Sequence, residues 1–453
     1  MLKVQTSYKE IWRIAWPIML SSMANTVINF TDTAFVARVG EKELAASALG
    51  GVFYFVMVMI GVAIGIGSQI LIARKAGENK PLEIGVIYDN SFIILLATAI
   101  CIQLLFYGLV PTLMHHIVND QAIAESCIVY LKARSWGIVF MMILISLRSF
   151  YTGIAFTRII TYSTILMMAL NVLLNYILTF GHLGFSPMGI FGVGTASAIS
   201  EAVAAVYAIL YTIFSKKLKQ FNLFRFKNIS FAEMFDIIKL SAPIVLQHIV
   251  SMGAWFLFFV LIEKIGSREL AVSNLVRSVY MVLMTPVWGY SQAANSMVSN
   301  VIGQGRKFEV LQLTKKITNL SFLTVLVSTS FCVLFPGFLF NLSTSDASLI
   351  HDAMGSFYVI SIGTIIFSIS MILLSAVSGT GNTKAAMIIE LVNIAVYLLY
   401  VYFTTQFFHP QVEIVWVCEI IYWSMMGALC YWYLKSGKWK ALNLKDHSGI
   451  ALS

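Results

Sequence analysis

Long apolar runs alternate with short polar breaks along the whole chain. Runs such as 52–71, 94–109 and 357–377 carry no charged residue, and they approach or reach the roughly 20 residues with which a helix spans a bilayer. With charged and glycine-containing breaks interpreted as loops, the pattern predicts twelve transmembrane helices and an all-α integral membrane protein. The helices are expected near residues 10–38, 47–73, 86–114, 126–148, 158–181, 190–215, 236–263, 272–301, 312–341, 349–378, 383–407 and 411–434.

The same landmarks occur twice in the sequence, 226 positions apart. Pro17 recurs as Pro243, and the alignment from residue 17 to residue 80 needs no gap. Gly40 recurs as Gly266 in the same way. A repeat of this length holds six helices, so both halves enter the bilayer in the same direction. The sequence therefore predicts two pseudo-symmetric six-helix lobes, which are parallel repeats about the membrane normal.

Composition and charge agree with a membrane protein and predict its orientation. Hydrophobic residues make up 59% of the 453 residues and charged residues only 11%, a balance far from that of soluble domains. Most of the 30 Lys and Arg fall in the N-terminal segment, the C-terminal tail and alternate loops. By the positive-inside rule this side is cytoplasmic, so we expect a multi-pass protein of the cytoplasmic (inner) membrane with both termini cytoplasmic. The net charge of +9 then reflects contact with anionic lipid rather than nucleic acid.

A basic segment joins the two predicted lobes. We assign residues 1–228 to the N-terminal lobe, which ends in a cytoplasmic linker at 216–228, and residues 229–453 to the C-terminal lobe. The linker mixes Lys and Arg with Phe. Such a segment either lies at the lipid headgroups or forms a solvated loop, and the sequence favours neither.

Few ionisable residues fall inside the predicted helices. Asp32 in the first helix shares a helical face with Asn25 and Asn29, at positions i, i+4 and i+7. A carboxyl group in a bilayer is unfavourable unless it faces water, faces a partner or carries a proton. Asp32 is therefore the main candidate for a group that binds a proton in one conformation and releases it in another. The alternative is a solvated position near the outer mouth.

Glu201 is the second candidate for binding a coupling ion, because it lies deep in the sixth helix beside Ser197. Glu390 and Glu419 lie about two turns inside their helices, where a glutamate can reach the headgroups or meet a cation on a neighbouring helix. Polar side chains within apolar helices tend to find one another. We therefore expect a polar chamber close to Asp32, lined by Asn25, Asn171, Asn175, Ser197 and Glu201.

The second half offers three further cavity candidates, Gln247, His248 and Arg277. Imidazole changes its charge near neutral pH, so a proton role is possible for His248, although a single membrane histidine often only hydrogen-bonds two helices together. Arg277 either pairs with a carboxylate across the cavity or reaches the outer headgroups.

Pro17 and Pro243 lie at equivalent positions early in the first helix of each half. Proline removes one backbone hydrogen bond and clashes with the preceding turn, so each helix can kink there. The alternative is that both prolines are tolerated in the first turn of a helix. A matched pair of helices that can kink, one of them carrying Asp32, suits an alternating-access transporter.

These motifs in this order, with twelve spans, resemble the multidrug and toxic compound extrusion (MATE) family over nearly the whole chain. The motifs are Trp16-Pro17-Ile18, residues 31–40, Leu44-Ala45, residues 171–178, the glycines Gly189, Gly192 and Gly194, residues 289–293 and Gly303-Gln304-Gly305. The resemblance implies two six-helix lobes in a V around a central cavity, and cation-coupled efflux of organic cations. The DinF-like branch looks most similar, since it places an acidic residue in the first helix fifteen residues after a proline, as Asp32 follows Pro17.

The resemblance also marks two acidic residues that this chain lacks. A family acid in the Asn-x-x-x-Asp motif of the fifth helix falls on Asn175, after Asn171, and asparagine does not titrate. A glutamate that another branch places in the seventh helix would fall near Ser251. Asp32 is therefore the main residue expected to couple the ion to export, and the sequence does not decide whether that ion is H⁺ or Na⁺.

We predict a secondary active multidrug exporter that exchanges small organic cations or amphipathic drugs for H⁺ or Na⁺ by alternating access. We expect a monomer in the lipid membrane, without a cofactor, a metal or a nucleic-acid partner. The alternative is a lipid-linked saccharide flippase of the same superfamily, for which a strongly cationic cavity is expected; only Arg277 and Arg148 could line a cavity here. An enzyme is not predicted, because the sequence has no visible metal-ligand cluster, nucleophile–base arrangement or Walker-type loop.

Overall fold

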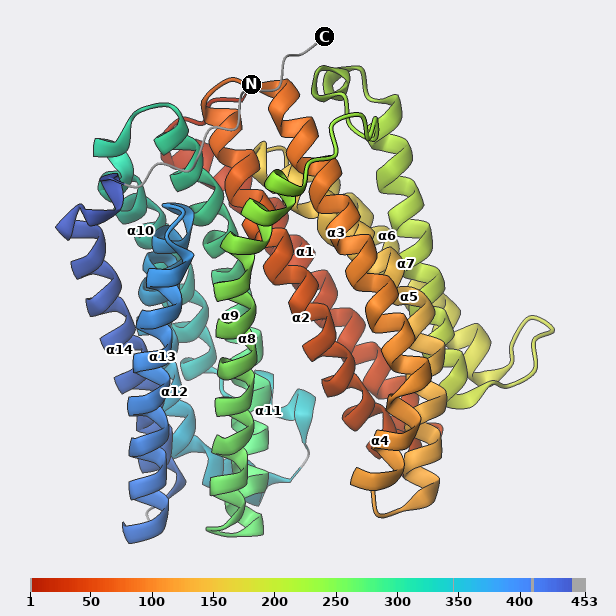
Figure 1. Ribbon diagram of the computed structural model, residues 1–453. Coiled ribbons are helices and arrows are strands. Elements are labelled where there is room, and N and C mark those ends of the chain that lie inside the picture. Colours follow the sequence, from red (N-terminus) through yellow and green to blue (C-terminus); the bar gives the residue numbers. More distant parts are fainter. Residues whose placement is uncertain (1, 345, 409–410, 442–453) are drawn as a thin grey trace. The chain divides into compact units, whose positions relative to one another are not determined.

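The computed structural model describes residues 2–344, 346–408 and 411–441, and these residues fold into helices without a strand (Figure 1). The predicted position of the C-terminal tail therefore concerns residues that lie partly outside the described ones. Eleven of the described helices are long and apolar enough to cross a membrane, and α1 is the twelfth long helix. The long helices are α1 (Tyr8–Ala37), α2 (Glu41–Gly77), α3 (Pro81–Gly108), α5 (Gln121–Gly153), α6 (Arg158–Phe180), α7 (Gly189–Phe214), α8 (Phe231–Glu263), α9 (Ser267–Gly303), α10 (Val310–Leu334), α12 (Ala347–Gly379), α13 (Thr383–Phe403) and α14 (Val412–Ser436). The short elements are α4 (Val110–Ile117), α11 (Gly337–Ser343), η1 (Lys216–Phe221), η2 (Lys307–Glu309), η3 (Thr404–Phe408) and η4 (Lys438–Ala441).

Two predicted helices are each broken into a long and a short helix. The helix expected at 86–114 divides into α3 and α4, and the one expected at 312–341 divides into α10 and α11. Pro111 lies in the first turn of α4, and Pro336 directly precedes α11. Proline has no N–H to continue the preceding turn, so it begins a new helix. Both breaks were predicted wrongly as continuous helices.

Equivalent helices of the two repeats begin with the same capping interaction. The side chain of Asp120 accepts hydrogen bonds from the backbone N–H groups two and three residues later, at 2.8 and 3.4 Å, and so begins α5. Asp346 does the same for α12, at 2.9 and 3.2 Å. An aspartate at this position satisfies N–H groups that have no partner within the helix. The repeat in the sequence therefore extends to the local geometry.

The repeat also preserves a close helix contact at the end of α5 and α12. A Cβ atom on Gly153 would lie 2.6 Å from the side chain of Ile72 and 3.3 Å from the carbonyl oxygen of Gln69. A Cβ atom on Gly379 would lie 2.6 Å from the carbonyl oxygen of Asn295, the repeat equivalent of Gln69. Because a backbone oxygen cannot move aside easily, glycine is needed where α12 meets α9, and its counterpart lets α5 approach α2 equally closely.

The contacts within the chain group its residues into two compact units, each containing residues from both halves of the sequence. The first unit is Leu20–Val245, and the second unit is Lys3–Met19 together with Leu246–Ser453. Hydrogen bonds attach the N-terminal segment to the second unit, since Asn300 accepts from the Val4 N–H at 3.2 Å and Lys316 donates to the Thr6 carbonyl at 2.8 Å. The division of the sequence at residue 228 concerns the repeat, and it stays a prediction.

The boundary between the units falls just after a proline in two helices. The division lies two residues after Pro17 in α1 and two residues after Pro243 in α8. Both prolines lie inside continuous helices, well beyond the first turn. The alternative interpretation, that they are tolerated as first-turn prolines, is therefore wrong. Each proline leaves one carbonyl of the preceding turn without its helical N–H donor.

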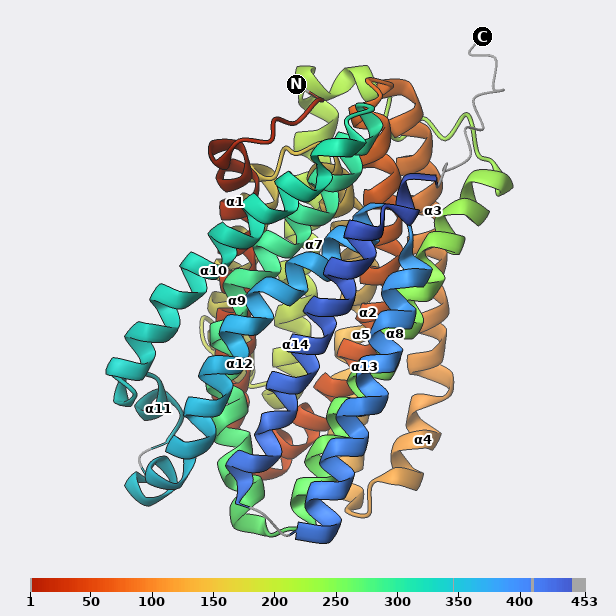
Figure 2. The ribbon, with the colours of Figure 1, turned by 90° about the vertical axis from the view of Figure 1, so that its left-hand side faces the viewer.

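Within each unit, one long helix contacts most of the others. In the first unit α5 packs against α2, α3 and α7, and α7 also packs against α6. In the second unit α12 packs against α9, α10 and α14, and α12 and α14 lie side by side in Figure 2. Since α5 and α12 are repeat equivalents, each repeat organises its helices around the same element.

The linker is held against α3 rather than forming a free loop. The carboxylate of Asp89 accepts hydrogen bonds from the backbone N–H groups of Phe224, Arg225 and Phe226, at 2.8, 3.1 and 2.8 Å. Phe224 and Phe226 have φ angles of 61° and 50°, a left-handed conformation that bulky residues adopt rarely. The ring of Phe224 also packs on Tyr88, with centroids 5.3 Å apart. The polar anchor and the aromatic contacts together support this backbone conformation.

Candidate functional site

Four polar side chains from three helices of the first unit form one hydrogen-bonded group, which we call the Asp32 network. Asn175 donates to Asp32 Oδ1 at 2.6 Å, and Ser197 donates to Asp32 Oδ2 at 3.2 Å. Asn171 donates to Ser197 at 3.1 Å, and Asn175 also donates to Asn171 at 3.2 Å. Asp32 comes from α1, the two asparagines come from α6 and Ser197 comes from α7. Asp32 is partly exposed, whereas its three partners are buried.

The local sequence explains how these helices come close enough. Asn171 and Asn175 are four residues apart, so they project from one face of α6. A Cβ atom on Gly192 would lie 2.9 Å from the backbone of Leu178 in α6. A Cβ atom on Gly194 would lie 2.8 Å from Ala133 in α5. The glycine run at the start of α7 therefore lets α7 pack tightly against both neighbours.

A buried ion pair lies next to the Asp32 network. Arg134 of α5 donates to Glu201 Oε1 of α7 at 2.7 Å, and the exposed fractions of the two side chains are only 12% and 3%. The guanidinium of Arg134 also lies over the ring of Tyr54, 4.4 Å from its centroid. Arg134 and Glu201 both interact electrostatically with Asp32. The carboxylate of Glu201 is thus already paired with a cation.

Gly137 makes room for that carboxylate. A Cβ atom on Gly137 would lie 2.2 Å from Glu201 Oε2 and 3.1 Å from the Cα of Ala198. Gly137 follows Arg134 by about one turn of α5, so the same face supplies both the cation and the space. Any larger residue would displace Glu201 from its partner.

Arg134 is the residue that the sequence analysis missed. It lies inside α5, and only 12% of its side chain is exposed. Its position within the predicted span 126–148 was the available signal, because an arginine inside a span needs a partner.

Of the predicted chamber, the structure joins Asn175 and Ser197 directly to Asp32 and Asn171 through these two, with Glu201 beside them. Asn25 and Asn29 are not joined to this group by any hydrogen bond between the described side chains. Asn25 is partly exposed and Asn29 is exposed. The roles of all these residues in transport stay predictions.

The second unit holds a buried carboxyl group in a different position. Glu390 of α13 accepts hydrogen bonds from Gln247 at 2.7 Å, Ser251 at 2.7 Å and Tyr422 at 2.8 Å. Another branch of the family places a glutamate at the position near Ser251. Here the carboxylate reaches that position from α13 rather than from α8. The expectation that Glu390 meets a cation or the headgroups is wrong, because it is buried and its hydrogen-bond partners are neutral.

Glu419 of α14 is bound in a similar way by neutral donors. Its Oε2 accepts from Tyr280 and from the indole of Trp423, both at 2.9 Å. It is buried, and no described cation pairs with it. A cation or headgroup contact, which was expected for Glu419 as well, is therefore wrong too.

The remaining candidates of the second half are not joined to these carboxyl groups. The Nε2 atom of His248 is buried without a hydrogen-bond partner among the described residues. Arg277 places its guanidinium over the ring of Phe259, 5.0 Å from the centroid. Neither expectation for Arg277 describes this contact, and no described carboxylate pairs with it. Gln247 is the one of the three that contacts a carboxyl group, that of Glu390.

Comparisons with known proteins agree with the repeat and the fold. The MatE family model matches residues 17–177 and again residues 243–403. A probable multidrug resistance protein NorM from Thermotoga maritima is 25% identical over 440 residues, which cover 95% of this chain and 93% of that protein. A probable multidrug resistance protein NorM from Agrobacterium fabrum is 24% identical over 299 residues, 66% of this chain and 64% of that protein.

Solved structures match over almost the whole chain. A MOP superfamily transporter from Pyrococcus furiosus, described with a binding pocket of reverse polarity, superposes with a TM-score of 0.89 at 18% identity, covering 97% of this chain and 98% of that one. A multidrug resistance MATE family transporter in an outward-facing conformation gives the same TM-score and identity, with 97% of each chain covered. At this identity the likeness shows the fold alone. The DinF-like branch stays a prediction. Because the family model matches twice and covers more than half of the chain, this protein belongs to the MatE family.

Proposed function

We propose that the protein is a secondary active multidrug exporter that exchanges organic cations or amphipathic drugs for protons by alternating access. The names of the NorM relatives support the substrate class, and the many apolar helices support a role within the membrane. The Asp32 network is the observation that carries the proposal. Transport of this kind needs neither an enzymatic step nor a cofactor.

Asp32 is suited to exchange a proton because its direct partners are neutral. Asn175 and Ser197 donate to the two carboxylate oxygens. The hydroxyl of Ser197 can rotate from donor to acceptor when the carboxyl group gains a proton, so both protonation states can be hydrogen-bonded. Glu201 differs, because loss of its charge would leave the largely enclosed Arg134 guanidinium without a partner. We therefore assign proton exchange to Asp32 and a positioning role to Glu201.

Competition between the proton and the drug makes the cycle an exchange. Ionised Asp32 attracts an organic cation, and protonated Asp32 does not. The two ligands then bind alternative states of one site, and each favours the conformation to which it binds better. Asn175 cannot titrate, so the Asp32 network supplies one proton-exchanging group.

Pro17 supplies a place where α1 can bend. It lies two residues before α1 passes from the second unit to the first unit, and Asp32 lies on the part that belongs to the first unit. The missing backbone hydrogen bond weakens the helix at this point. A change at Asp32 can therefore move its part of α1 without unfolding the helix. Pro243 occupies the matching place in α8.

The flippase alternative has less support. A pyrophosphate-linked substrate calls for several free cations in a cavity. Arg134 is neutralised by Glu201, and Arg277 packs on Phe259. Of the two arginines expected to line a cavity, this leaves Arg148 alone, which is one cation rather than several. A coupling ion other than H⁺ stays open to test, because carboxylate and amide oxygens also bind Na⁺.

Transport in proteoliposomes tests the proposal. Efflux of a fluorescent organic cation such as ethidium is measured with a pH gradient and a sodium gradient imposed separately. We expect the pH gradient to drive efflux, and Asp32→Asn to reduce it by about tenfold or more, since coupling of this size is typical between two linked ligands. Asp120→Asn is the matched control, because it makes the same carboxyl-to-amide change at a distant helix cap where asparagine also caps well.

Two results would contradict the proposal. Efflux by Asp32→Asn at the parental rate under the same pH gradient would remove Asp32 from the coupling. Efflux driven by sodium alone, and indifferent to pH, would replace the proton by Na⁺. Size-exclusion chromatography and circular dichroism of the purified variant establish that it is folded.

A further inference from the structure

Arg148 is a partly exposed cation for which the described structure provides no partner. It lies in α5, five residues before the helix ends at Gly153. Its Nε atom is buried without a hydrogen-bond partner, and no described carboxylate forms an ion pair with it. Arg134 on the same helix is paired with Glu201. A buried N–H donor without an acceptor is unfavourable, and a ligand that supplies an anionic acceptor to the guanidinium would remove this cost.

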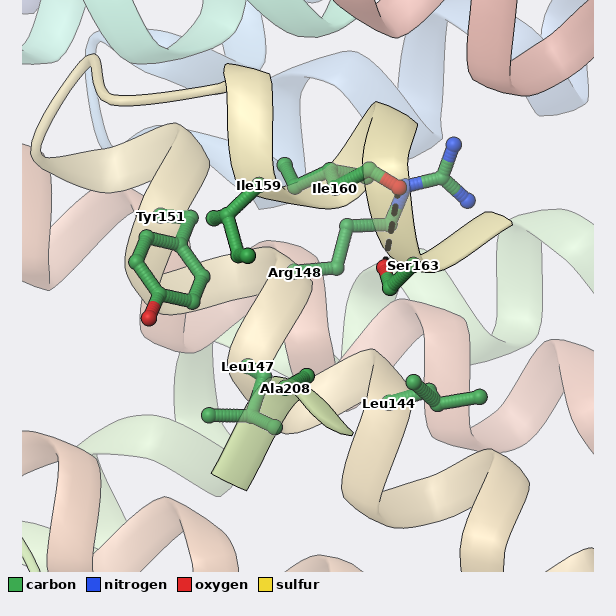
Figure 3. A pocket seen from close by; sticks show the side chains of 8 residues that line it. All are labelled: Leu144, Leu147, Arg148, Tyr151, Ile159, Ile160, Ser163 and Ala208. Carbon is green, nitrogen blue, oxygen red and sulfur yellow. Dashed lines mark hydrogen bonds between the residues drawn. The ribbon is translucent and has the colours of Figure 1, made fainter. Parts of the chain in front are cut away.

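Arg148 lines a pocket formed by α5, α6 and α7, all within the first unit. The wall consists mainly of Leu144, Leu147, Ile159 and Ile160. Figure 3 shows the Arg148 side chain extending across the pocket toward the first turns of α6.

The polar groups of this pocket leave the guanidinium free. The hydroxyl of Ser163 donates to the carbonyl oxygen of Ile160 at 2.9 Å, and that of Tyr151 is hydrogen-bonded to Thr212 at 2.6 Å. The lining contains no acidic residue. The pocket wall is therefore apolar except for one guanidinium and two hydroxyl groups, and both hydroxyls already form hydrogen bonds within the protein.

The repeat shows that helix packing does not require an arginine here. The equivalent position in α12 is Leu374, which is buried with 4% exposure. A leucine therefore fits at this level of the central helix, and the arginine of the first unit needs another explanation. Ligand binding is one that also accounts for its lack of a partner.

The depth and surroundings of the pocket favour a lipid headgroup. Its residues lie within about two turns of the end of α5, the start of α6 and the end of α7. Exposed cations follow at Arg158 and Lys216, and exposed apolar side chains at Tyr162 and Phe214. This end of the helices is the predicted cytoplasmic side, where anionic lipids gather. Cations beside apolar surface match a phosphate with acyl chains attached.

We propose that Arg148 binds the phosphodiester oxyanion of an anionic glycerophospholipid in this pocket. The planar guanidinium donates two parallel hydrogen bonds to one phosphate group, a geometry that Lys cannot reproduce. The apolar wall shields the buried side of the pair, and the glycerol and acyl chains lie outside the pocket against the exposed apolar side chains. This binding site is independent of the Asp32 network and of the proposed transport.

Lipid retention by the purified protein tests this proposal. The parent, Arg148→Leu, Arg148→Lys and the control Arg158→Leu are incubated with phosphatidylglycerol or phosphatidylcholine in detergent, and bound lipid is counted by native mass spectrometry. We expect Arg148→Leu to reduce bound phosphatidylglycerol by about tenfold, which is the loss of one charge-assisted pair. Arg148→Lys should retain part of the binding, and Arg158→Leu should lose less than about twofold because its cation is exposed.

Thermal unfolding provides the second measurement. Phosphatidylglycerol should raise the melting temperature of the parent and of Arg158→Leu, but not that of Arg148→Leu. Equal lipid retention by the parent and Arg148→Leu would overturn the proposal. So would equal protection by inorganic phosphate without lipid, since the ligand would then be a free anion. If Arg148→Leu does not fold, loss of phosphatidylglycerol in Arg148→Lys supports the site, and unchanged retention in that variant overturns it.

Discussion

The two units hold their buried carboxyl groups by different means. In the first unit Glu201 is paired with Arg134 at 2.7 Å. In the second unit Glu390 and Glu419 accept hydrogen bonds from neutral amide, hydroxyl and indole groups, with no described cation beside them. If one member of such an ion pair loses its charge, the other remains as an unpaired charge in a low-dielectric environment, which is unfavourable. A carboxyl group among neutral donors carries no such constraint. The Arg134–Glu201 pair therefore stabilises the structure in one charge state, whereas Glu390 and Glu419 can gain or lose a proton without leaving a partner charge unpaired.

One conserved helix contact shows where the difference arose. Ser21 of α1 is hydrogen-bonded to Thr164 of α6 at 2.7 Å. The equivalent residues of the second repeat are Gln247 and Glu390, and these also meet at 2.7 Å. The same two helices touch at the same level in both repeats. Two hydroxyls in one repeat have become an amide and a carboxyl in the other.

The opposite change occurs further along the same two helices. The Asp32 and Asn175 positions correspond to Phe258 and Val401, which are both fully buried in the second unit. Phe258 packs against Trp416 with ring centroids 4.9 Å apart. A polar network in one repeat is thus an aromatic core in the other. The same pair of helices can therefore hold a carboxyl group at either of two heights along their contact, and each repeat has one at only one of these heights.

Removal of the cation from the ion pair should produce the largest effect on stability. Arg134→Met leaves the Glu201 carboxylate buried and unpaired, so we expect the free energy of unfolding in detergent to fall by about 3–5 kcal/mol. The double variant Arg134→Met/Glu201→Leu should recover much of this loss, because it removes both charges together. Equal stability of the parent and the single variant would mean that the pair does not distinguish the two units.

A pair of equivalent glycines sharpens the comparison. A Cβ atom on Gly137 would lie 2.2 Å from Glu201 Oε2, whereas one on Gly363 would come no closer than 3.6 Å to Glu419. We expect Gly137→Ala to destabilise by about 1–3 kcal/mol through overpacking. Gly363→Ala should be neutral or stabilise by up to about 1 kcal/mol through helix propensity. Chemical unfolding of the two single variants decides this, and equal effects would contradict it.

The neutral surroundings of Glu390 predict a mild response to a carboxyl-to-amide change. Glu390→Gln keeps an oxygen that can accept from Ser251 or Tyr422, so we expect a loss of about 1 kcal/mol. Glu390→Leu leaves three donors without an acceptor, one of them the buried Gln247, and should lose more, about 1–3 kcal/mol. A loss in Glu390→Gln as large as in Arg134→Met would instead indicate a charged Glu390 with a hidden counter-ion. Unfolding curves of both Glu390 variants provide the measurement.

The helix caps should give the smallest and most equal effects. Asp120→Ala and Asp346→Ala each remove the acceptor of two N–H groups, so both should lower the melting temperature slightly and by similar amounts. Hydrogen bonds from the Ala122 and Ile123 N–H groups lower the pKa of Asp120. Its contribution is therefore present above the ordinary aspartate pKa of about 4 and is lost as the pH falls below it. The difference between the parent and Asp120→Ala should shrink steadily as the melts are taken to pH values below about 4; a difference that does not change with pH would contradict the capping role.

The sequence predicts the parts of this molecule that are encoded locally. Helix positions follow from the apolar runs, and the repeat follows from landmarks such as Pro17 and Pro243. The contact between Asp32 and Asn175 follows from the rule that the few polar side chains within apolar helices tend to meet one another. The breaks before α4 and α11 were missed although Pro111 and Pro336 mark them. The loops are predicted from charged and glycine-containing breaks, and a single proline within an apolar run does not interrupt the hydropathy.

Partners that lie far apart in the sequence could not be predicted in the same way. Arg134 meets Glu201 across 67 residues, and Glu390 meets Ser251 across 139. Such contacts depend on the rotation of each helix about its own axis. A soluble helix reveals that rotation by an apolar stripe, but a helix in lipid is apolar on both its lipid-facing and its packed sides. The pairing information is therefore almost absent from the hydropathy pattern.

The division of α1 and α8 between the two units has a consequence for synthesis of the chain. Residues Lys3–Met19 belong to the same unit as Leu246–Ser453, so the segment made first must wait for the second half before it can pack. The first unit likewise remains incomplete until the ribosome has passed Val245. A cut in the linker at 216–228 would therefore leave neither fragment with a whole unit. Each half of the sequence depends on the other to finish folding. The whole chain therefore folds as one cooperative unit rather than as two domains that fold one after the other during synthesis.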